Sequence, residues 1–266
     1  MNEFITPQGT VFYEATGNGP EVVFLHSALT DHRQWSLQVD ALSQEYRCIS
    51  YDLLGHGSSG KAPDNYDPAD TLLLLMDHLD VSSATLVGSS RGGEASIHAA
   101  IRYPDRIRSM VLVGTGLFGF QPELNVPEPS IYGEYEEALS HHHVDRLVEL
   151  AEVIWLIGIR GHEQDVSWAS RESFRRMYRD FLTNHGDFPR YTDIDDVSSL
   201  KNLDIPTMVI VGEHDTAFCL AVADHLERTL RRATIVPMPG TAHFPNLSKP
   251  QAVNELLRQW LKKTYE

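Results

Sequence analysis

The chain has 266 residues, a formal net charge of −15 at pH 7 and 42% hydrophobic residues. This length predicts one large domain, or one domain with an insertion, that can bury a sizeable core. The acidic balance argues against nucleic acid and anionic membranes as partners. The charge says little about small substrates; we expect a small-molecule substrate as the partner, and the oligomeric state stays open.

The first ten residues, MNEFITPQGT, lack the basic and apolar regions of a signal peptide. No apolar run approaches the roughly 18 residues that a membrane span needs. These features predict a soluble cytoplasmic protein. The two cysteines, Cys48 and Cys219, are too few for a disulfide framework, and we expect both to be packing residues.

Short apolar runs alternate with helical patterns along most of the chain. Apolar runs predict strands at residues 21–26, 47–52, 84–89, 107–114, 206–215 and 233–238. Helical patterns predict helices at 33–44, 68–80, 91–103, 218–230 and 251–263. This alternation predicts an α/β protein with a mostly parallel sheet and helices on both faces. A hairpin-like segment at 9–24, with the turn GNGP, is expected to add antiparallel strands at one edge.

The alternation stops at about residue 117 and resumes at about residue 206. Three prolines open this stretch, namely Pro122, Pro127 and Pro129. Two helical patterns, within 136–158 and 170–185, then follow with no strand between them. We therefore divide the chain into a first core part (1–116), a helical cap insertion (117–205) and a second core part (206–266).

The cap is expected to roof the site and to set substrate choice. Four of its aromatic residues are candidates to line the pocket, although aromatics at helical spacing more often form a cap core: Phe118, Trp155, Trp168 and Phe181. The cap also contains three consecutive histidines, His141 to His143. Adjacent residues point to different faces of a helix, so we expect solvated or capping histidines and no metal site.

The stretch LVGSSRGG, residues 86–93, has the glycine–x–serine–x–glycine spacing of a nucleophile elbow. Strand and helix come so close in this turn that the positions two before and two after the nucleophile must be small. Centred on Ser90, both positions are glycine. Centred on Ser89, they would be Val87 and Arg91, whose side chains would clash. The spacing therefore predicts Ser90 as the nucleophile.

A serine nucleophile needs a histidine base that is held by a carboxylate, in the chain order Ser, Asp or Glu, His. Asp215 ends a predicted strand, and His243 lies in a loop between the last strand and the last helix. Both are at carboxyl ends of strands, where open parallel sheets assemble their sites. Glu213 and His214 are rivals, but His214 adjoins the acid in sequence and is poorly placed to face it. We prefer Asp215 and His243.

The intermediate of acyl transfer also needs two hydrogen-bond donors for its oxyanion. One should be the backbone N–H of Arg91, which follows the nucleophile. The second should come from the loop after the strand at 21–26, where we predict the N–H of Ala28. We expect His26, at the start of this loop, to hold the loop in place and to take no part in catalysis.

Six motifs resemble those of the α/β-hydrolase fold superfamily in order and spacing: LHSALTDHRQW, YDLLGHGSSG, LVGSSRGG, YPDRIRSMVLVG, VIVGEHD and GTAHFPNLSKP. The resemblance covers residues from about 10 to 116 and from about 206 to 264. The chain looks most like 3-oxoadipate enol-lactonases, cofactor-free haloperoxidase-like esterases and C–C bond hydrolases. DLLGHGSSG is typical of the family without being catalytic, and Asp52 or His56 is expected to hold its loop.

This resemblance implies a serine esterase or lactonase with a Ser90–Asp215–His243 triad and no metal or organic cofactor. A serine at the elbow disfavours the dehalogenase and epoxide hydrolase branches, which carry an aspartate there. C–C bond cleavage of a vinylogous diketone and cofactor-free perhydrolysis use the same triad and stay open. A non-catalytic small-ligand receptor is the alternative from another class.

Arg91 departs from the family pattern, because the residue after the nucleophile is commonly Met, Leu or Gln. Its side chain has two possible roles. The guanidinium can bind a carboxylate of the substrate. It can instead form a salt bridge to an acidic neighbour at the helix start, which we weigh slightly ahead.

Overall fold

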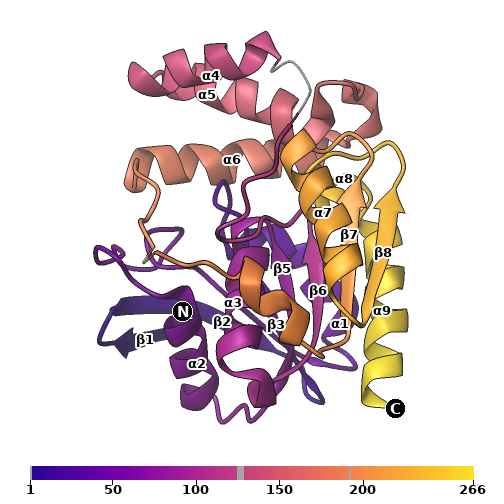
Figure 1. The fold of residues 1–266 in the computed structure, drawn as a ribbon. Helices are drawn as coiled ribbons and strands as arrows, with labels where there is room; N and C mark the ends of the chain where they lie inside the picture. The colour runs from indigo at the N-terminus through magenta and orange to yellow at the C-terminus, as the bar shows by residue number, and fades with distance from the viewer. Residues whose placement is uncertain (1, 125–128, 192) are drawn as a thin grey trace.

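A computed structural model describes residues 2–124, 129–191 and 193–266 (Figure 1). Its centre is an eight-stranded sheet in the order β1-β2-β4-β3-β5-β6-β7-β8. The strands are β1 (Asn2–Thr6), β2 (Gly9–Thr16), β3 (Glu21–Leu25), β4 (Arg47–Tyr51), β5 (Ala84–Ser89), β6 (Ile107–Val113), β7 (Thr207–Gly212) and β8 (Ala233–Met238). Strands β3 to β8 are parallel, whereas β2 is antiparallel to both β1 and β4. The predicted α/β class with a mostly parallel sheet is confirmed.

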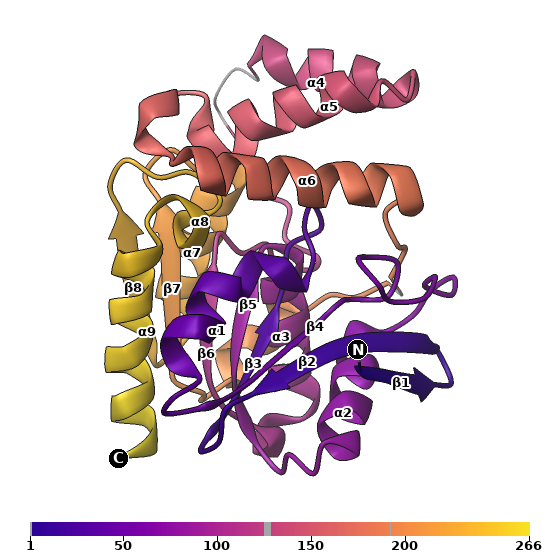
Figure 2. The ribbon, with the colours of Figure 1, turned by 180° about the vertical axis from the view of Figure 1, so that it is seen from behind.

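Helices cover both faces of this sheet (Figures 1 and 2). The α-helices of the described residues are α1 (Ser36–Leu42), α2 (Pro68–His78), α3 (Arg91–Arg102), α4 (Ser130–Ser140), α5 (Val144–Ala151), α6 (Trp168–Asn184), α7 (Ala217–Thr229), α8 (Pro245–Ser248) and α9 (Pro250–Tyr265), of which α4, α5 and α6 do not lie on a face of the sheet. Side chains alternate across β3, so Val22 and Phe24 pack with α1 and α9, whereas Val23 and Leu25 pack with α2, α3 and α7. Because helices bury both faces of the inner strands, the sequences of these strands are continuous apolar runs.

The expected hairpin at 9–24 is wrong in its pairing. Strand β2 pairs with β1 and β4, and β3 lies on the far side of β4. The GNGP segment does turn, with φ of +83° at Gly17 and +121° at Gly19, but the turn carries the chain past β4. Antiparallel strands do lie at one edge, but they are β1 and β2, and only β2 comes from the expected segment. The edge strand β1 was not predicted, because its sequence NEFIT is mostly solvent-exposed and lacks a continuous apolar pattern.

The segment between β6 and β7 carries α4, α5 and α6, which lie above the carboxyl ends of the strands (Figures 1 and 2). The chain turns between α4 and α5 at the three consecutive histidines, and all three are exposed. The expectation of solvated histidines is thus confirmed. Pro127 lies outside the described residues. No helix among the described residues is long and apolar enough to cross a membrane.

The four aromatic candidates of the cap occupy different places. Phe181 is 2% exposed and belongs to the cap core. Trp168 is 65% exposed on the outside of α6, where it borders surface hollows and is not part of the cap core. Its ring lies beneath the guanidinium groups of Arg171 and Arg175, which explains why a tryptophan is stable at the surface.

A buried histidine ties the end of the cap segment to the core. His98 on α3 has its Nδ1 2.9 Å from Asp196 Oδ1 and its Nε2 3.2 Å from Asp67 Oδ2. Asp67 also caps α2 and binds Arg102 at 2.5 Å. Burial lowers the pKa of His98, but the hydrogen bonds and charges of Asp196 and Asp67 outweigh it and raise the pKa to about 9. His98 is therefore an imidazolium between two carboxylates at neutral pH.

We expect this ion cluster to stabilise the fold below pH 6.5 and to lose that contribution as the pH rises through about 9, because the raised pKa belongs to the folded state only. His98→Gln should lower the free energy of unfolding by about 1–3 kcal/mol at pH 6. The difference from wild type should shrink above pH 9. Urea unfolding between pH 6 and 10 measures it, with exposed His162→Gln as the control. A difference that is constant with pH would contradict the ionic role.

Candidate active site

Ser90 lies at the turn between β5 and α3, where the structure strains the backbone. Its φ of +51° and ψ of −112° are rare for a residue with a side chain. Its N–H donates to Val113 O at 3.0 Å, and its carbonyl accepts from Glu94 N at 3.0 Å. These bonds hold the turn on the end of β6. This is the local conformation of a nucleophile elbow, in which the serine side chain stands at the crest of the turn.

The glycines on either side of Ser90 are required by close backbone contacts. A Cβ on Gly92 would lie 2.2 Å from Leu25 O, and a Cβ on Gly88 would lie 2.4 Å from Gly92 O. Both distances are far inside van der Waals contact, and the atoms that would have to move are backbone atoms. The Ser89 Oγ, by contrast, is fully buried and has no hydrogen-bond partner among the described residues.

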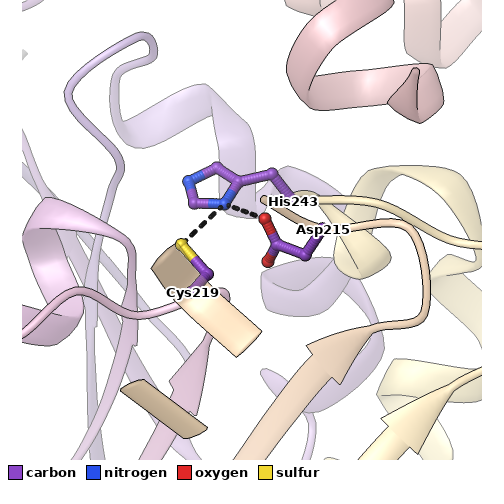
Figure 3. Close-up of side chains that lie close together, drawn as sticks. All are labelled: Asp215, Cys219 and His243. Carbon is purple, nitrogen blue, oxygen red and sulfur yellow. Dashed lines mark hydrogen bonds and ion pairs between the residues drawn. The ribbon is translucent and has the colours of Figure 1, made fainter. Parts of the chain in front are cut away.

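Asp215 and His243 form a buried hydrogen-bonded pair (Figure 3). His243 Nδ1 lies 2.9 Å from Asp215 Oδ1, and the same oxygen accepts the Thr216 N–H at 2.7 Å. The carboxylate makes Nδ1 the donor, which leaves Nε2 as a hydrogen-bond acceptor. Burial lowers the pKa of His243, but the charges and hydrogen bonds of Asp215 and Cys219 together outweigh burial and raise that pKa well above its usual value.

Glu213 and His214, the alternatives to Asp215 and His243, make hydrogen bonds elsewhere. Glu213 Oε2 accepts the Gly240 N–H at 2.9 Å and so braces the loop that carries the histidine. The backbone N–H of His214 donates to Thr241 O at 2.8 Å. No hydrogen bond or ion pair joins either side chain to His243 among the described residues.

The structure brings Ser90 and His243 to the end of the same strand, β6. Ser90 N–H binds Val113, and the next residue, Gly114, packs directly against His243. A Cβ on Gly114 would lie 2.6 Å from His243 O and 3.1 Å from Asp215 Oδ2, and its φ is +51°. Among the described residues, the Ser90 hydroxyl makes no hydrogen bond to the imidazole. Such bonds are often long before substrate binds.

The loop after β3 holds one peptide plane in a fixed orientation. Ser27 O accepts hydrogen bonds from Thr30 N at 3.1 Å and Thr30 Oγ1 at 3.2 Å, and His26 Nδ1 lies 2.7 Å from it. All described peptide bonds are trans, so the Ala28 N–H points away from this pinned carbonyl. In the described ranges no hydrogen bond reaches this N–H. The N–H of Arg91, at the first position of α3, has no helical acceptor either.

His26 and His56 buttress this loop. His26 Nε2 accepts the Leu53 N–H at 2.9 Å, so its Nδ1 carries the proton that is donated to Ser27 O. Burial lowers the pKa of His26, which keeps it in this neutral form. His56 Nε2 lies 3.0 Å from Ala28 O. Both histidines shape the predicted oxyanion loop, and the expectation that His26 is structural agrees with these contacts.

Arg91 forms the salt bridge that was one of its two expected roles. Its Nε lies 3.3 Å from Glu94 Oε2, one turn along α3. The guanidinium carbon lies 4.8 Å from the ring centre of Tyr191 and 5.9 Å from that of Phe118. Glu94 is part-buried, and desolvation raises the pKa of its carboxyl. The Arg91 side chain is only part-buried, which leaves it accessible to a ligand.

Three contacts of the site were not predicted from the sequence. Gly114 fits against the pair of His243 and Asp215, Cys219 Sγ lies 3.6 Å from His243 Nδ1, and Trp155 O accepts the His243 N–H at 2.9 Å. Trp155 belongs to a π-helical segment of the cap, Glu152–Gly158. Only the spacing of Cys219, one helical turn after Asp215, was a signal in the sequence.

The sheet order, the elbow after β5 and the helices inserted after β6 define an α/β-hydrolase fold. A family model agrees, because the model of the α/β hydrolase fold matches residues 20–250. The chain belongs to this family.

Curated relatives match almost the whole chain. One is the pimeloyl-[acyl-carrier protein] methyl ester esterase of Nitrosomonas europaea, which is 27% identical over 91% of this chain and 96% of its own. Another is 3-oxoadipate enol-lactonase 2 of Acinetobacter baylyi, 23% identical over 99% and 97%. The enol-lactonase from Burkholderia xenovorans is a similar solved structure, with a TM-score of 0.78, 23% identity and coverage of 98% and 100%.

Proposed function

We propose that this hydrolase cleaves small carboxylic esters or enol-lactones through an acyl-enzyme on Ser90. The hydrolase class and action on esters follow from the family and from relatives that are named esterases and lactonases. The observation that carries the serine mechanism is the strained Ser90 turn on β6, at the strand end where the hydrogen-bonded Asp215–His243 pair packs.

In the proposed cycle, His243 Nε2 takes the Ser90 proton while Oγ bonds to the carbonyl carbon. Asp215 stabilises the imidazolium through the proton on Nδ1. The N–H groups of Ala28 and Arg91 bind the oxyanion, and loss of one such donor typically costs about 10²–10³ in rate. The C–O bond to the leaving group then breaks, and the alkoxide leaves with the proton from His243.

Water completes the cycle in the same geometry. His243 removes a proton from water as the water oxygen attacks the acyl carbon, and it returns that proton to Ser90 Oγ as the acyl–serine bond breaks. The carboxylic acid is released. With a lactone, the leaving alcohol or enol stays attached to the acyl chain, so one product molecule is formed.

We also propose that the Arg91 side chain favours substrates that carry a carboxylate. The guanidinium lies one residue after the nucleophile and is part-buried. Its partner Glu94 competes for it, so the two side chains should affect selectivity in opposite directions. A charge-assisted hydrogen bond contributes about 1.5–3 kcal/mol, which corresponds to about 10–100-fold in KM.

A substrate panel tests this proposal. Paired aryl esters and enol-lactones, each with and without a free carboxylate, are assayed with wild type, Arg91→Gln and Glu94→Gln. Arg91→Gln should raise KM by about 10–100-fold for the carboxylated members alone, and Glu94→Gln should lower it. An unchanged selectivity in Arg91→Gln would contradict the side-chain role. Cleavage of a vinylogous diketone but of no ester would overturn the proposed substrate class.

A further inference from the structure

A thiol lies against the histidine–aspartate pair, and the proposed cycle does not use it (Figure 3). Cys219 is in the first turn of α7, where Thr216 Oγ1 accepts its backbone N–H. Its Sγ lies 3.6 Å from His243 Nδ1 and 3.7 Å from Gly114 O. The sulfur, one nitrogen of His243 and one oxygen of Asp215 all lie within 4.8 Å of one another, and all three residues are buried.

The second observation is an unsatisfied carboxylate oxygen in the same place. Asp215 Oδ1 receives the hydrogen bonds from His243 and Thr216, whereas Oδ2 is buried without a partner among the described residues. The Asp215 side chain has no exposed surface. A buried anionic oxygen that lacks a donor is costly, and a cation would satisfy it. Figure 3 shows the carboxylate beside the imidazole and the thiol, with one of its oxygens joined to the imidazole nitrogen.

We propose that Asp215, Cys219 and His243 form an inhibitory site for a thiophilic divalent cation, with Zn²⁺ as the reference ion. Zinc bonds of about 2.3 Å to sulfur and 2.0 Å to nitrogen, at a tetrahedral angle, place these two atoms about 3.5 Å apart. The observed separation is 3.6 Å. When the metal replaces the 2.9 Å hydrogen bond between His243 Nδ1 and Asp215 Oδ1, the carboxylate must turn so that Oδ2, the oxygen without a donor, faces the metal about 3.3 Å from that nitrogen.

The charges and ligand types favour zinc over magnesium or calcium. A thiolate and a carboxylate together neutralise a divalent cation, which reduces the cost of placing it in a buried site. Thiolate and imidazole ligands suit zinc and cobalt, whereas magnesium and calcium prefer oxygen ligands. Binding displaces the Cys219 thiol proton into solvent, so affinity should rise with pH.

Inhibition follows from the imidazole, and this step rests on the proposed serine mechanism. A metal on Nδ1 uses the lone pair there, so the proton of the neutral ring must sit on Nε2. Nε2 then donates a hydrogen bond and cannot accept the Ser90 proton. The metal-bound protein therefore lacks its general base, although Ser90 and the oxyanion loop are unchanged.

A zinc titration of aryl acetate hydrolysis tests the site in the purified protein after preincubation. Wild type should lose activity with zinc, regain it with EDTA and be insensitive to magnesium. For Cys219→Ser, the zinc concentration that halves the metal-free rate of this variant should be at least about tenfold higher than for wild type. Even residues that only hydrogen-bond to a metal ligand change metal affinity by about 10–100-fold. Cys48→Ser removes the other cysteine, on β4, and should behave as wild type. Equal zinc sensitivity in Cys219→Ser and wild type would overturn the site.

Cobalt absorption separates the metal site from the enzymatic activity. Co²⁺ bound to a thiolate gives a charge-transfer band, which we expect in wild type and in Ser90→Ala and not in Cys219→Ser. A protein that shows the band but hydrolyses no ester would keep the metal site and contradict the proposed function. A protein that hydrolyses esters but gives the same spectrum with and without Cys219 would refute the metal site alone.

Discussion

Ser90→Ala should abolish ester hydrolysis, and Ser89→Ala should leave it nearly unchanged. The two serines are adjacent in sequence but differ in surroundings. Ser90 has the strained φ of +51° and part-exposed position of an elbow residue, whereas Ser89 ends β5 and is fully buried. Removing an activated nucleophile lowers kcat by about 10⁴–10⁶-fold. The remaining activity comes from substrate binding and the oxyanion donors.

Ser89→Ala is a matched control, because it removes a hydroxyl that makes no hydrogen bond among the described residues. Loss of an unpaired buried hydroxyl should be neutral or slightly stabilising. Rates with an aryl acetate and covalent labelling by a fluorophosphonate measure both variants. Label should attach to wild type and Ser89→Ala and not to Ser90→Ala. Labelling of Ser90→Ala, or comparable activity in it and wild type, would refute the assignment.

The fold could be predicted because its strands and glycines carry strong local signals. Strands β5 and β8 were predicted with their observed bounds, since each is a short run between turn residues. The pairing of β2 could not be predicted in the same way. The pairing of β2 with β1 and β4 depends on the order of all strands in the sheet. The tight GNGP turn suggested a hairpin of β2 and β3, but β4 lies between these two strands.

The candidate site was predictable where function imposes a spacing, and not where contacts join distant segments. Gly88 and Gly92 identified Ser90 because both lie against backbone atoms. The contact of Gly114 with His243, by contrast, joins residues far apart in the sequence and leaves no periodic pattern. The hydrogen bond from His243 N to Trp155 O likewise depends on how a π-helical segment of the cap packs on the core. Such contacts can be identified only from the three-dimensional structure.

Asp215→Asn should lower kcat by about 10³ through loss of charge, with the histidine still correctly oriented. Asp215 Oδ1 accepts from both His243 Nδ1 and Thr216 N, so an asparagine oxygen is held in that place by two donors. The proton therefore stays on Nδ1. What is lost is the attraction between the carboxylate and the imidazolium, about 4 kcal/mol at a separation of 4 Å and an effective dielectric constant of 20.

The comparison with Glu213→Gln and Asp215→Ala tests this distinction between charge and orientation. A glutamine side chain in the first variant can still accept the Gly240 N–H that Glu213 holds at 2.9 Å, so Glu213→Gln should stay within about tenfold of wild type. Asp215→Ala removes the orienting oxygen as well and should be slower than Asp215→Asn. Steady-state rates with an aryl acetate, and thermal unfolding to confirm the fold, provide the measurement. Equal losses in Asp215→Asn and Asp215→Ala would mean that charge alone matters, and a larger loss in Glu213→Gln would make Glu213 the orienting acid.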